Sequence, residues 1–186
     1  MNLSQFYSQI NPKSDKGTEH NYIDGYYDEL FSPLRQSPIS LLEIGVQEGY
    51  SFNLWRSWFK QANITCIDLQ WQTTIERVNS SPNSRGYKMD AFTIEAIESV
   101  GDSQYDFIIE DGPHTVETQI FAANHWSKKL KVNGKLIIED IQNPENDVPL
   151  ILSSIRNRSD LTHKLIDLRP TKGRWDDYIV EITKVS

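Results

Sequence analysis

The stretch "ISLLEIGVQEGYS" (39–51) decides the fold. A mostly apolar run is followed by two glycines four residues apart, Gly45 and Gly49, and then by Ser51. Glycines at such a turn let the backbone approach a ligand closely, and a serine can cap the helix that follows. The stretch therefore predicts a buried strand, a tight turn and a helix over 51–59. It lacks the middle glycine of the dinucleotide fingerprint, so a plain strand-to-helix turn explains the glycines equally well.

Similar apolar runs recur along the chain, and amphipathic segments separate most of them. This alternation favours a doubly wound, Rossmann-like α/β domain, with a mostly parallel sheet and helices on both faces. About ten residues separate the last two strands, too few for a helical crossover, so we expect one antiparallel edge strand. Strands are expected at 39–45, 63–69, 105–111, 134–140, 162–168 and 177–183, with a short one ending at Asp90, and helices at 51–59 and 115–126.

The segment ahead of the first strand predicts an extra helix over 17–31. Tyr22, Tyr26 and Phe31 lie on one side of it, and we expect that side to pack over the carboxyl edge of the sheet or beside it. The sequence thus predicts a single domain over 1–186, made of an N-terminal helical cap (1–35) and a Rossmann-like core (36–186).

The composition narrows the classes of function. The chain has 186 residues and a formal net charge of -7, which argues against a broad nucleic-acid surface because phosphate binding needs clustered Lys and Arg. A small or neutral partner is expected instead, and a homo-oligomer is left open. The single cysteine, Cys66, cannot form an internal disulfide, and no apolar run is long enough to span a membrane. The N-terminus lacks the apolar core of a signal peptide, so the sequence predicts a cytoplasmic protein.

Acidic residues end the second and third expected strands. Asp68 lies about twenty residues beyond the glycine turn, where a carboxylate commonly accepts hydrogen bonds from a ribose diol. Asp90 could meet an adenine amino group. Either residue could instead cap a helix, but together they favour a cofactor that contains a nucleoside.

Together with Asp68 and Asp90, the stretches "LLEIGVQEGYS" and "DFIIEDGPH" resemble the class I S-adenosylmethionine-dependent methyltransferases. The resemblance extends from residue 16 to the end of the chain. The resemblance implies S-adenosylmethionine as the cofactor, lying across the strand ends of a seven-stranded sheet. More narrowly, "SDKGTEHNY", "DGPH" and "GKLIIEDI" resemble the metal-dependent sugar O-methyltransferases of macrolide biosynthesis and related polysaccharide-modifying enzymes. The cofactor-binding residues that follow from this comparison are Glu43, Gly45, Gly49, Asp68 and Asp90.

Two of the expected strands end in the same letters, "IIED". Asp111 ends one of them, and Glu139 and Asp140 end the other, so three carboxylates converge if these strands are neighbours. Like charges so close need a cation. Oxygen ligands favour Mg²⁺, with Mn²⁺ as a substitute, and no Cys or His cluster favours zinc. The alternative is that Glu139 and Asp140 only accept hydrogen bonds from the turn.

His114 follows Asp111 by three residues, and the Gly-Pro turn between them can bring its imidazole back toward the metal site. A free imidazole, with a pKa of about 6.5, deprotonates a hydroxyl poorly, but a metal ion lowers the pKa of a hydroxyl that it binds. We expect His114 to be the general base, and the resemblance implies the same roles for it and for the three metal ligands. The alternative is that His114 only caps a helix or lies in a loop without a catalytic role.

Other residues are assigned less specifically. Lys16 and Tyr22, together with His20, could close over the methionine end of the cofactor, although His20 could equally face solvent. Trp71 and Trp175 lie near strand ends and could flank the substrate or the adenine, whereas Trp55 and Trp58 are expected in the core.

The sequence thus predicts an S-adenosylmethionine- and Mg²⁺-dependent O-methyltransferase that acts on a hydroxyl of a sugar or glycan. The macrolide enzymes carry longer segments around the sugar, so the acceptor stays open, and another small diol such as a catechol is an alternative. A metal-independent N-methyltransferase is a second alternative, although the chain lacks the Asn/Asp-Pro-Pro-aromatic motif of amino methyltransferases. A non-catalytic cofactor-binding protein is a third, and the intact carboxylates argue against it.

Overall fold

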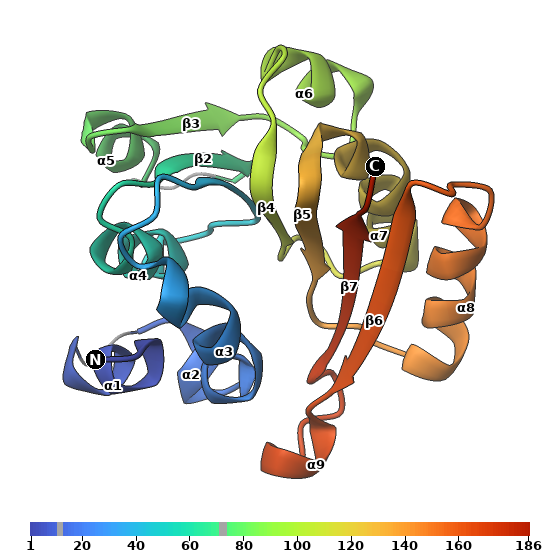
Figure 1. Ribbon diagram of the computed structural model, residues 1–186, viewed down its shortest axis with the longest axis horizontal. Coiled ribbons are helices and arrows are strands. Elements are labelled where there is room, and N and C mark those ends of the chain that lie inside the picture. Colours follow the sequence, from blue (N-terminus) through green and yellow to red (C-terminus); the bar gives the residue numbers. More distant parts are fainter. Residues whose placement is uncertain (11–12, 71–73) are drawn as a thin grey trace.

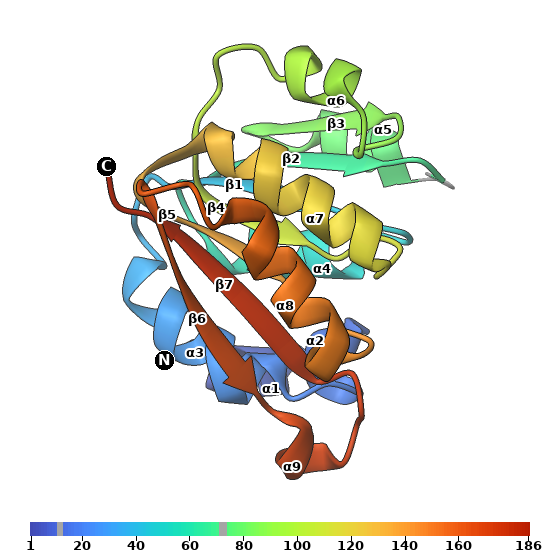
Figure 2. The same ribbon diagram turned by 90° about the vertical axis from the view of Figure 1, so that its right-hand side faces the viewer.

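The computed structural model describes residues 1–10, 13–70 and 74–186. Within these residues a seven-stranded sheet has the order β3-β2-β1-β4-β5-β7-β6 (Figures 1 and 2). The strands are β1 (Ser40–Ile44), β2 (Asn63–Asp68), β3 (Ser84–Lys88), β4 (Tyr105–Glu110), β5 (Leu130–Ile138), β6 (Leu161–Asp167) and β7 (Tyr178–Lys184). The α-helices are α1 (Leu3–Ile10), α2 (Asp15–Thr18), α3 (Asp28–Phe31), α4 (Tyr50–Trp58), α5 (Thr74–Ser80), α6 (Ile94–Ser99), α7 (Val116–His125), α8 (Pro144–Ile155) and α9 (Arg169–Lys172).

The sheet confirms the predicted fold class. Strands β1 to β5 pair in parallel, and β7 pairs antiparallel with both β5 and β6. The predicted hairpin is therefore present, but its reversed strand lies one place in from the edge, and β6 forms the edge itself. A hairpin always brings its two strands side by side, and here the chain places the second of them against β5.

Two apolar cores cover the two faces of the sheet. One face packs against α4 and the N-terminal helices, and there the predicted core residues Trp55 and Trp58 are fully buried. The other face packs against α6, α7 and α8. Figure 2 shows α7 and α8 together on that face. Parallel strands buried on both sides in this way leave their carboxyl ends as the accessible edge for a ligand.

The helix predicted over 17–31 is present only in pieces. After α2 the chain forms a π-helical turn, η1 (Ile23–Tyr27), which continues into α3. Within this wider turn the adjacent Tyr26 and Tyr27 both reach carboxylates of the sheet, Glu181 and Glu139 respectively. Such π-helical turns are rare in proteins and commonly occur at functional sites. The segment therefore packs on one face of the sheet and reaches its carboxyl edge, where the sequence predicted it to lie over the edge or beside it.

In the described part of the chain no helix combines the length and the apolar character that crossing a membrane requires.

Candidate active site

The turn after β1 requires glycine for two reasons. Gly45 has a φ of +80°, and a Cβ added to it would lie 1.8 Å from the carbonyl oxygen of Asp111. The backbones of the β1 and β4 turns are therefore in direct contact. Gly49, with a φ of 79°, precedes the first residue of α4. The turn after β1 thus approaches the turn after β4 closely, whereas the approach of a ligand that its glycines predict stays a prediction.

Asp68 holds this glycine turn in place. Its Oδ2 accepts hydrogen bonds from the backbone amides of Val46 and Gln47, both at 2.7 Å, and its Oδ1 accepts one from Gln70 at 2.7 Å. A carboxylate offers about four acceptor positions, so these three bonds leave room for one more donor. The predicted ribose contact of Asp68 therefore competes with a structural role that the sequence did not reveal.

A cavity of about 300 Å³ opens beside Asp68 at the ends of β1, β2 and β4. We call it the apolar pocket. Asp68 and Asp90 both line it, and Phe92 and the turn at Gly45 form other parts of its wall. Apolar side chains with a few convergent polar groups are typical of sites for small ligands. Two predicted nucleoside-binding carboxylates thus lie in one cavity.

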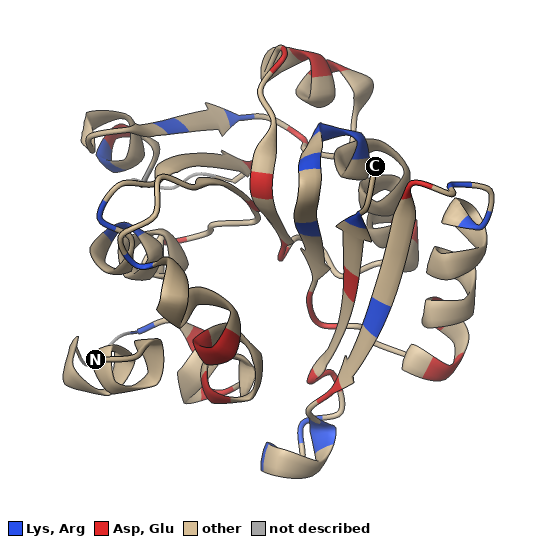
Figure 3. Ribbon diagram, in the orientation of Figure 1, with Lys and Arg blue, Asp and Glu red and all other residues tan. Residues whose placement is uncertain are grey.

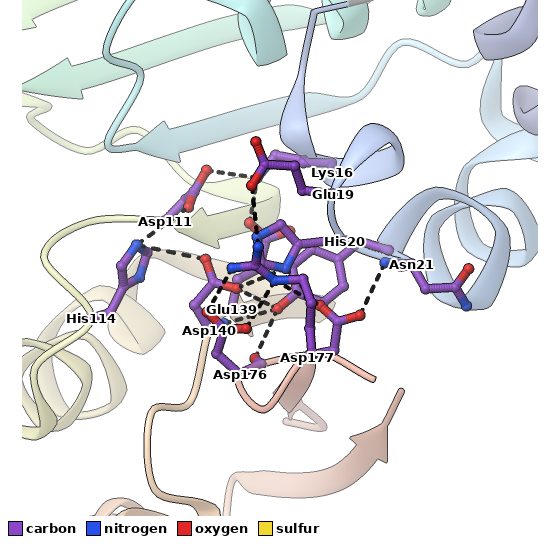
Figure 4. Close-up of polar contacts among 12 residues, drawn as sticks. Lys16, Glu19, His20, Asn21, Asp111, His114, Glu139, Asp140, Asp176 and Asp177 are labelled. Carbon is purple, nitrogen blue, oxygen red and sulfur yellow. Dashed lines mark hydrogen bonds and ion pairs between the residues drawn. The ribbon is translucent and has the colours of Figure 1, made fainter. Parts of the chain in front are cut away.

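A second cluster of carboxylates lies at the ends of β4 and β5, which are neighbours as the prediction required. Figure 3 shows acidic segments at these two strand ends. The ammonium of Lys16, which is 1% exposed, contacts Asp111 at 2.7 Å and also contacts Glu139 (Figure 4). The other oxygen of Glu139 accepts a hydrogen bond from the hydroxyl of Tyr27 at 2.6 Å. Lys16 is therefore a buried cation of this cluster.

One ammonium does not neutralise the carboxylates around it. Burial alone would lower the pKa of Lys16, but the charges of Asp111 and Glu139 outweigh burial and raise it well above its ordinary value. Burial and mutual repulsion nevertheless raise the pKa values of Asp111 and Glu139, despite Lys16. Burial also raises the pKa of Glu43 to about 7. These carboxyl groups therefore ionise less readily than exposed ones, and a further cation would favour their ionised form.

Asp111, His114 and Asp140 converge on one small volume. Nε2 of His114 lies 3.6 Å from Oδ2 of Asp140 and 4.0 Å from Oδ1 of Asp111. One ligand atom from each of the three lies within 4.8 Å of the others, a separation that a single metal ion can bridge. His114 and Asp140 both have positive φ, 57° and 52°, a conformation that is uncommon for residues other than glycine and that clusters at functional sites. The geometry thus joins the predicted base to two of the three predicted metal ligands.

The N-terminal segment supplies further partners. His20 is 4% exposed, and its Nδ1 lies 2.6 Å from Asp177 and 3.4 Å from Asp140. The hydroxyl of Tyr22 donates to Asp140 and to the carbonyl oxygen of Asp176. His20 therefore does not face solvent. Lys16, His20 and Tyr22 reach the carboxylates at the strand ends.

A second cavity, of about 230 Å³, lies between the N-terminal segment and the start of α4. We call it the polar pocket. Its lining consists of residues 13–15, Glu19, residues 45–48, Tyr50, Ser51, Asp111 and His114. It shares Gly45, Gln47 and Asp111 with the apolar pocket. The two cavities therefore adjoin each other at the glycine turn.

Sequence reasoning missed three buried residues at this site. Tyr27 donates a hydrogen bond to Glu139, and Asp177 pairs with His20. Glu110 is buried, and one of its carboxylate oxygens lacks a hydrogen-bond partner in the described structure. Burial and the charge of Asp111 raise the pKa of Glu110 to about 8. The repeated "IIED" contains Glu110, but the letters alone do not show which of the paired acids faces the core. Of the two tryptophans predicted near the substrate, Trp175 is 58% exposed and Trp71 lies outside the described residues.

Known proteins share sequence and fold with this chain. A family model described as "Methyltransferase domain" matches residues 42–141. The 8-demethyl-8-(2-methoxy-alpha-L-rhamnosyl)-tetracenomycin-C 3'-O-methyltransferase of Streptomyces olivaceus is 27% identical over 136 residues. That match covers 69% of this chain and 34% of the relative. This chain is therefore similar to about a third of that protein.

Solved structures share the fold at lower identity. MycE methyltransferase from the mycinamycin biosynthetic pathway, in complex with Mg and SAH, has a TM-score of 0.76 and 18% identity to this chain. The match covers 100% of this chain and 55% of the MycE chain. A second MycE structure, with the same scores, also contains mycinamycin VI. A structure of the fibrillarin/Nop5p complex has a TM-score of 0.63 and 16% identity, and the match covers 79% of this chain and 73% of the matched chain. Differently named proteins thus share the fold, and it does not identify the acceptor.

Proposed function

This chain belongs to the methyltransferase-domain family of class I S-adenosylmethionine-dependent enzymes, and from that premise we propose that it methylates a hydroxyl of a sugar or glycan with the help of Mg²⁺. The observation that carries the proposal is the convergence of Asp111, His114 and Asp140 beside a cavity suited to a nucleoside. The similarity to a tetracenomycin sugar 3'-O-methyltransferase supports a sugar hydroxyl as the acceptor.

The apolar pocket fits the nucleoside part of the cofactor. Asp68 and Asp90 offer acceptor oxygens there, Phe92 offers an aromatic surface, and a side chain at Gly45 would obstruct the turn beside it. Glu43 is also proposed to act at this end of the site, since it is fully buried behind the glycine turn and one of its oxygens has no hydrogen-bond partner in the described structure. Gly49 belongs to the same proposal, because its positive φ lets the chain enter α4.

A divalent cation fits the carboxylate cluster. Carboxylate oxygens of Asp111 and Asp140 face a common position beside His114, and a cation there would favour the ionised form of Asp111, whose pKa is raised by burial despite Lys16. Mg²⁺ prefers such oxygen ligands and retains several waters, which a substrate hydroxyl can replace. Glu139, the third proposed ligand, already contacts Lys16 and Tyr27, so it would have to exchange Lys16 for the ion.

The residues of the chain then have separate tasks. His114 is proposed to accept the hydroxyl proton at Nε2, the nitrogen that faces Asp111 and Asp140. The cation would lower the pKa of the acceptor hydroxyl, and the cofactor would supply an electrophilic methyl group. The glycine turn and Asp68 orient the cofactor, while Lys16 and Tyr22 hold the carboxylates in position. Orientation of the two reactants supplies much of the rate gain in such transfers.

We also propose that residues 1–35 act as a cap of the core formed by residues 36–186. Lys16, His20, Tyr22 and Tyr27 all bind carboxylates that lie at or beyond the ends of the core strands. The cap therefore completes the site and does not only cover it.

Transfer of a labelled methyl group from S-adenosylmethionine to a panel of glycosides and catechols tests the function. We expect transfer to glycosides that is lost on chelation and restored by Mg²⁺. His114→Ala should reduce turnover roughly 10²–10⁴-fold, as for loss of a general base, without weakening S-adenosylhomocysteine binding. His163→Ala, at an exposed position of β6, is the matched control. Transfer that survives complete chelation would contradict the metal-dependent reaction, and transfer to catechols alone would exclude the sugar.

A further inference from the structure

Trp175 differs from the other tryptophans that the structure describes. Trp55, Trp58 and Trp126 are fully buried, and the indole N–H of each donates a hydrogen bond inside the protein. Trp175 is 58% exposed, and its N–H has no hydrogen-bond partner among the described residues. Single exposed apolar side chains are common on proteins, so the position of Trp175 has to decide whether it has a role.

Trp175 lies in a turn that other contacts hold in place. The turn is closed by a hydrogen bond from the amide of Asp177 to the carbonyl oxygen of Arg174, at 3.4 Å. The guanidinium of Arg174 binds Asp176 within the turn, at 2.9 and 3.0 Å, and Glu19 of the cap at 3.1 Å. Asp177 is fully buried. A ligand that binds Trp175 therefore does not have to order this turn first, which lowers the cost of binding.

This turn borders the carboxylate cluster on the side of Asp140. One ligand atom from each of His20, Asp140 and Asp176 lies within 4.8 Å of the others, and Figure 4 shows these three residues together. The carbonyl oxygen of Asp176 accepts a hydrogen bond from Tyr22, whose hydroxyl also donates to Asp140. Neither Trp175 nor Asp176 lines the apolar or the polar pocket. The turn thus borders the proposed cation site and lies outside both cavities.

An indole ring at this position suits a sugar. A pyranose ring carries C–H groups on its faces, and these groups can pack on an aromatic surface while the hydroxyls around the ring remain free for polar contacts. The exposed N–H of the indole can also donate to a sugar oxygen. A carboxylate cluster alone would bind any small diol equally well, whereas an aromatic surface beside it favours an acceptor with a ring.

We propose that Trp175 is the surface on which the pyranose ring of the acceptor packs, so that this residue determines the affinity for the acceptor. The inference rests on the proposed function, because it needs a sugar hydroxyl at the cation site. Trp175 holds the ring and takes no part in the transfer of the proton or the methyl group. Its loss therefore changes the binding of the acceptor and leaves the chemistry and the cofactor site intact.

The first test is kinetic and uses the glycoside that is methylated fastest in the panel described above. KM and kcat are measured with Mg²⁺ present for the wild type, Trp175→Ala and Trp175→Phe. Val132→Ala is the matched control, because Val132 is 56% exposed and lies near the amino end of β5, far along the strand from Asp140. Calorimetric titration with S-adenosylhomocysteine and thermal unfolding check the cofactor site and the fold of each variant.

We expect Trp175→Ala to raise KM roughly tenfold, the effect of losing about 60 Å² of apolar contact. The values of kcat and of the S-adenosylhomocysteine affinity should stay within about twofold of the wild type, because binding that is equal in the ground and transition states changes KM alone. Trp175→Phe, which retains an aromatic face, should restore most of the affinity. An unchanged KM in Trp175→Ala, or a fall in kcat alone, would overturn the inference and leave the proposed function standing. Absence of transfer from the wild type to every glycoside would overturn both.

The second test measures the contact directly, by quenching of tryptophan fluorescence with acrylamide. The difference between the wild type and Trp175→Phe isolates the signal of Trp175. We expect the same glycoside, added with S-adenosylhomocysteine and Mg²⁺, to protect this signal from acrylamide. Unchanged quenching at a saturating glycoside concentration would mean that the sugar does not cover the indole, and the inference would be wrong.

Discussion

At the scale of single residues, backbone strain is concentrated where the chemistry is proposed. Five non-glycine residues have positive φ in the described ranges, and two of them, Asn83 and Asn133, lie outside the turns at the carboxyl ends of the strands. The other three are Gln47, His114 and Asp140, and each lies in the turn after a core strand. Such conformations cost roughly 1–3 kcal/mol each and persist only where surrounding contacts enforce them. The strand-end turns therefore position these side chains at the expense of backbone stability.

Glu43 should make the stability of the protein depend on pH. Burial raises its pKa in the folded protein to about 7, above the value of an exposed glutamate, so the folded state retains its proton over a range where the unfolded state has lost it. Its contribution to stability is therefore complete at low pH and is lost as the pH rises toward 7. We expect the unfolding free energy of the wild type to fall by about 2 kcal/mol more than that of Glu43→Gln between pH 5 and 7. Urea unfolding with chelator present measures this difference.

Glu117→Gln, at an exposed position of α7, controls for the loss of a carboxylate. Identical pH dependence in the wild type and Glu43→Gln would show that Glu43 ionises normally in the folded protein.

Lys16 should be essential for stability when no metal is present. Lys16→Met leaves Asp111 and Glu139 without their buried counter-ion, and breaking a buried pair in this way typically costs about 3–5 kcal/mol. We expect such a loss in urea unfolding with chelator, and a partial recovery on addition of Mg²⁺. Lys60→Met, at an exposed lysine after α4, should change stability little. A stable Lys16→Met protein in chelator would mean that the carboxylates do not need this ammonium.

At the scale of elements, the sequence located the strand ends and one strand pairing, but not the order of the whole sheet. The repeated "IIED" predicted that β4 and β5 would bring acids together if they were neighbours, and the two strands do pair. The hairpin of β6 and β7 was also predictable from its short connection. The position of β7 between β5 and β6, however, depends on packing against β5. The π-turn η1 was not predictable, because it depends on Tyr26 and Tyr27 reaching acids on strands far along the chain.

The turn between β1 and α4 should not tolerate any side chain at Gly45. A Cβ there would meet the carbonyl of Asp111, so Gly45→Ala must displace one of the two turns. We expect turnover to fall about a hundredfold, the cost of misplacing reacting groups by roughly 1 Å. Gly101→Ala is the matched control, because Gly101 also has positive φ, 59°, but a Cβ there would meet nothing within 4 Å. Equal activities of the two variants in the methyl-transfer assay would contradict the importance of this contact.

At the scale of the whole molecule, the N-terminal segment and the connection from β6 to β7 are joined over the site. Lys172 donates to the carbonyl oxygens of Gly17 and His20, both at 2.7 Å, and Arg174 pairs with Glu19 at 3.1 Å. These contacts link residues more than 150 positions apart. The periodicity of the sequence predicts each element separately, but it carries no information on which distant loops meet. The fold class was therefore predictable, while Lys16 as a buried counter-ion was not.

We propose above all that one chain holds a nucleoside cofactor and, next to it, a cation site that depends on Asp111. Calorimetric titration of chelator-treated protein with S-adenosylhomocysteine, followed by Mg²⁺, tests this most directly. We predict that wild type and Asp111→Asn both bind the cofactor, and that only the wild type then binds Mg²⁺. Cofactor binding without any Mg²⁺ binding, or equal Mg²⁺ binding by Asp111→Asn, would contradict this two-part site.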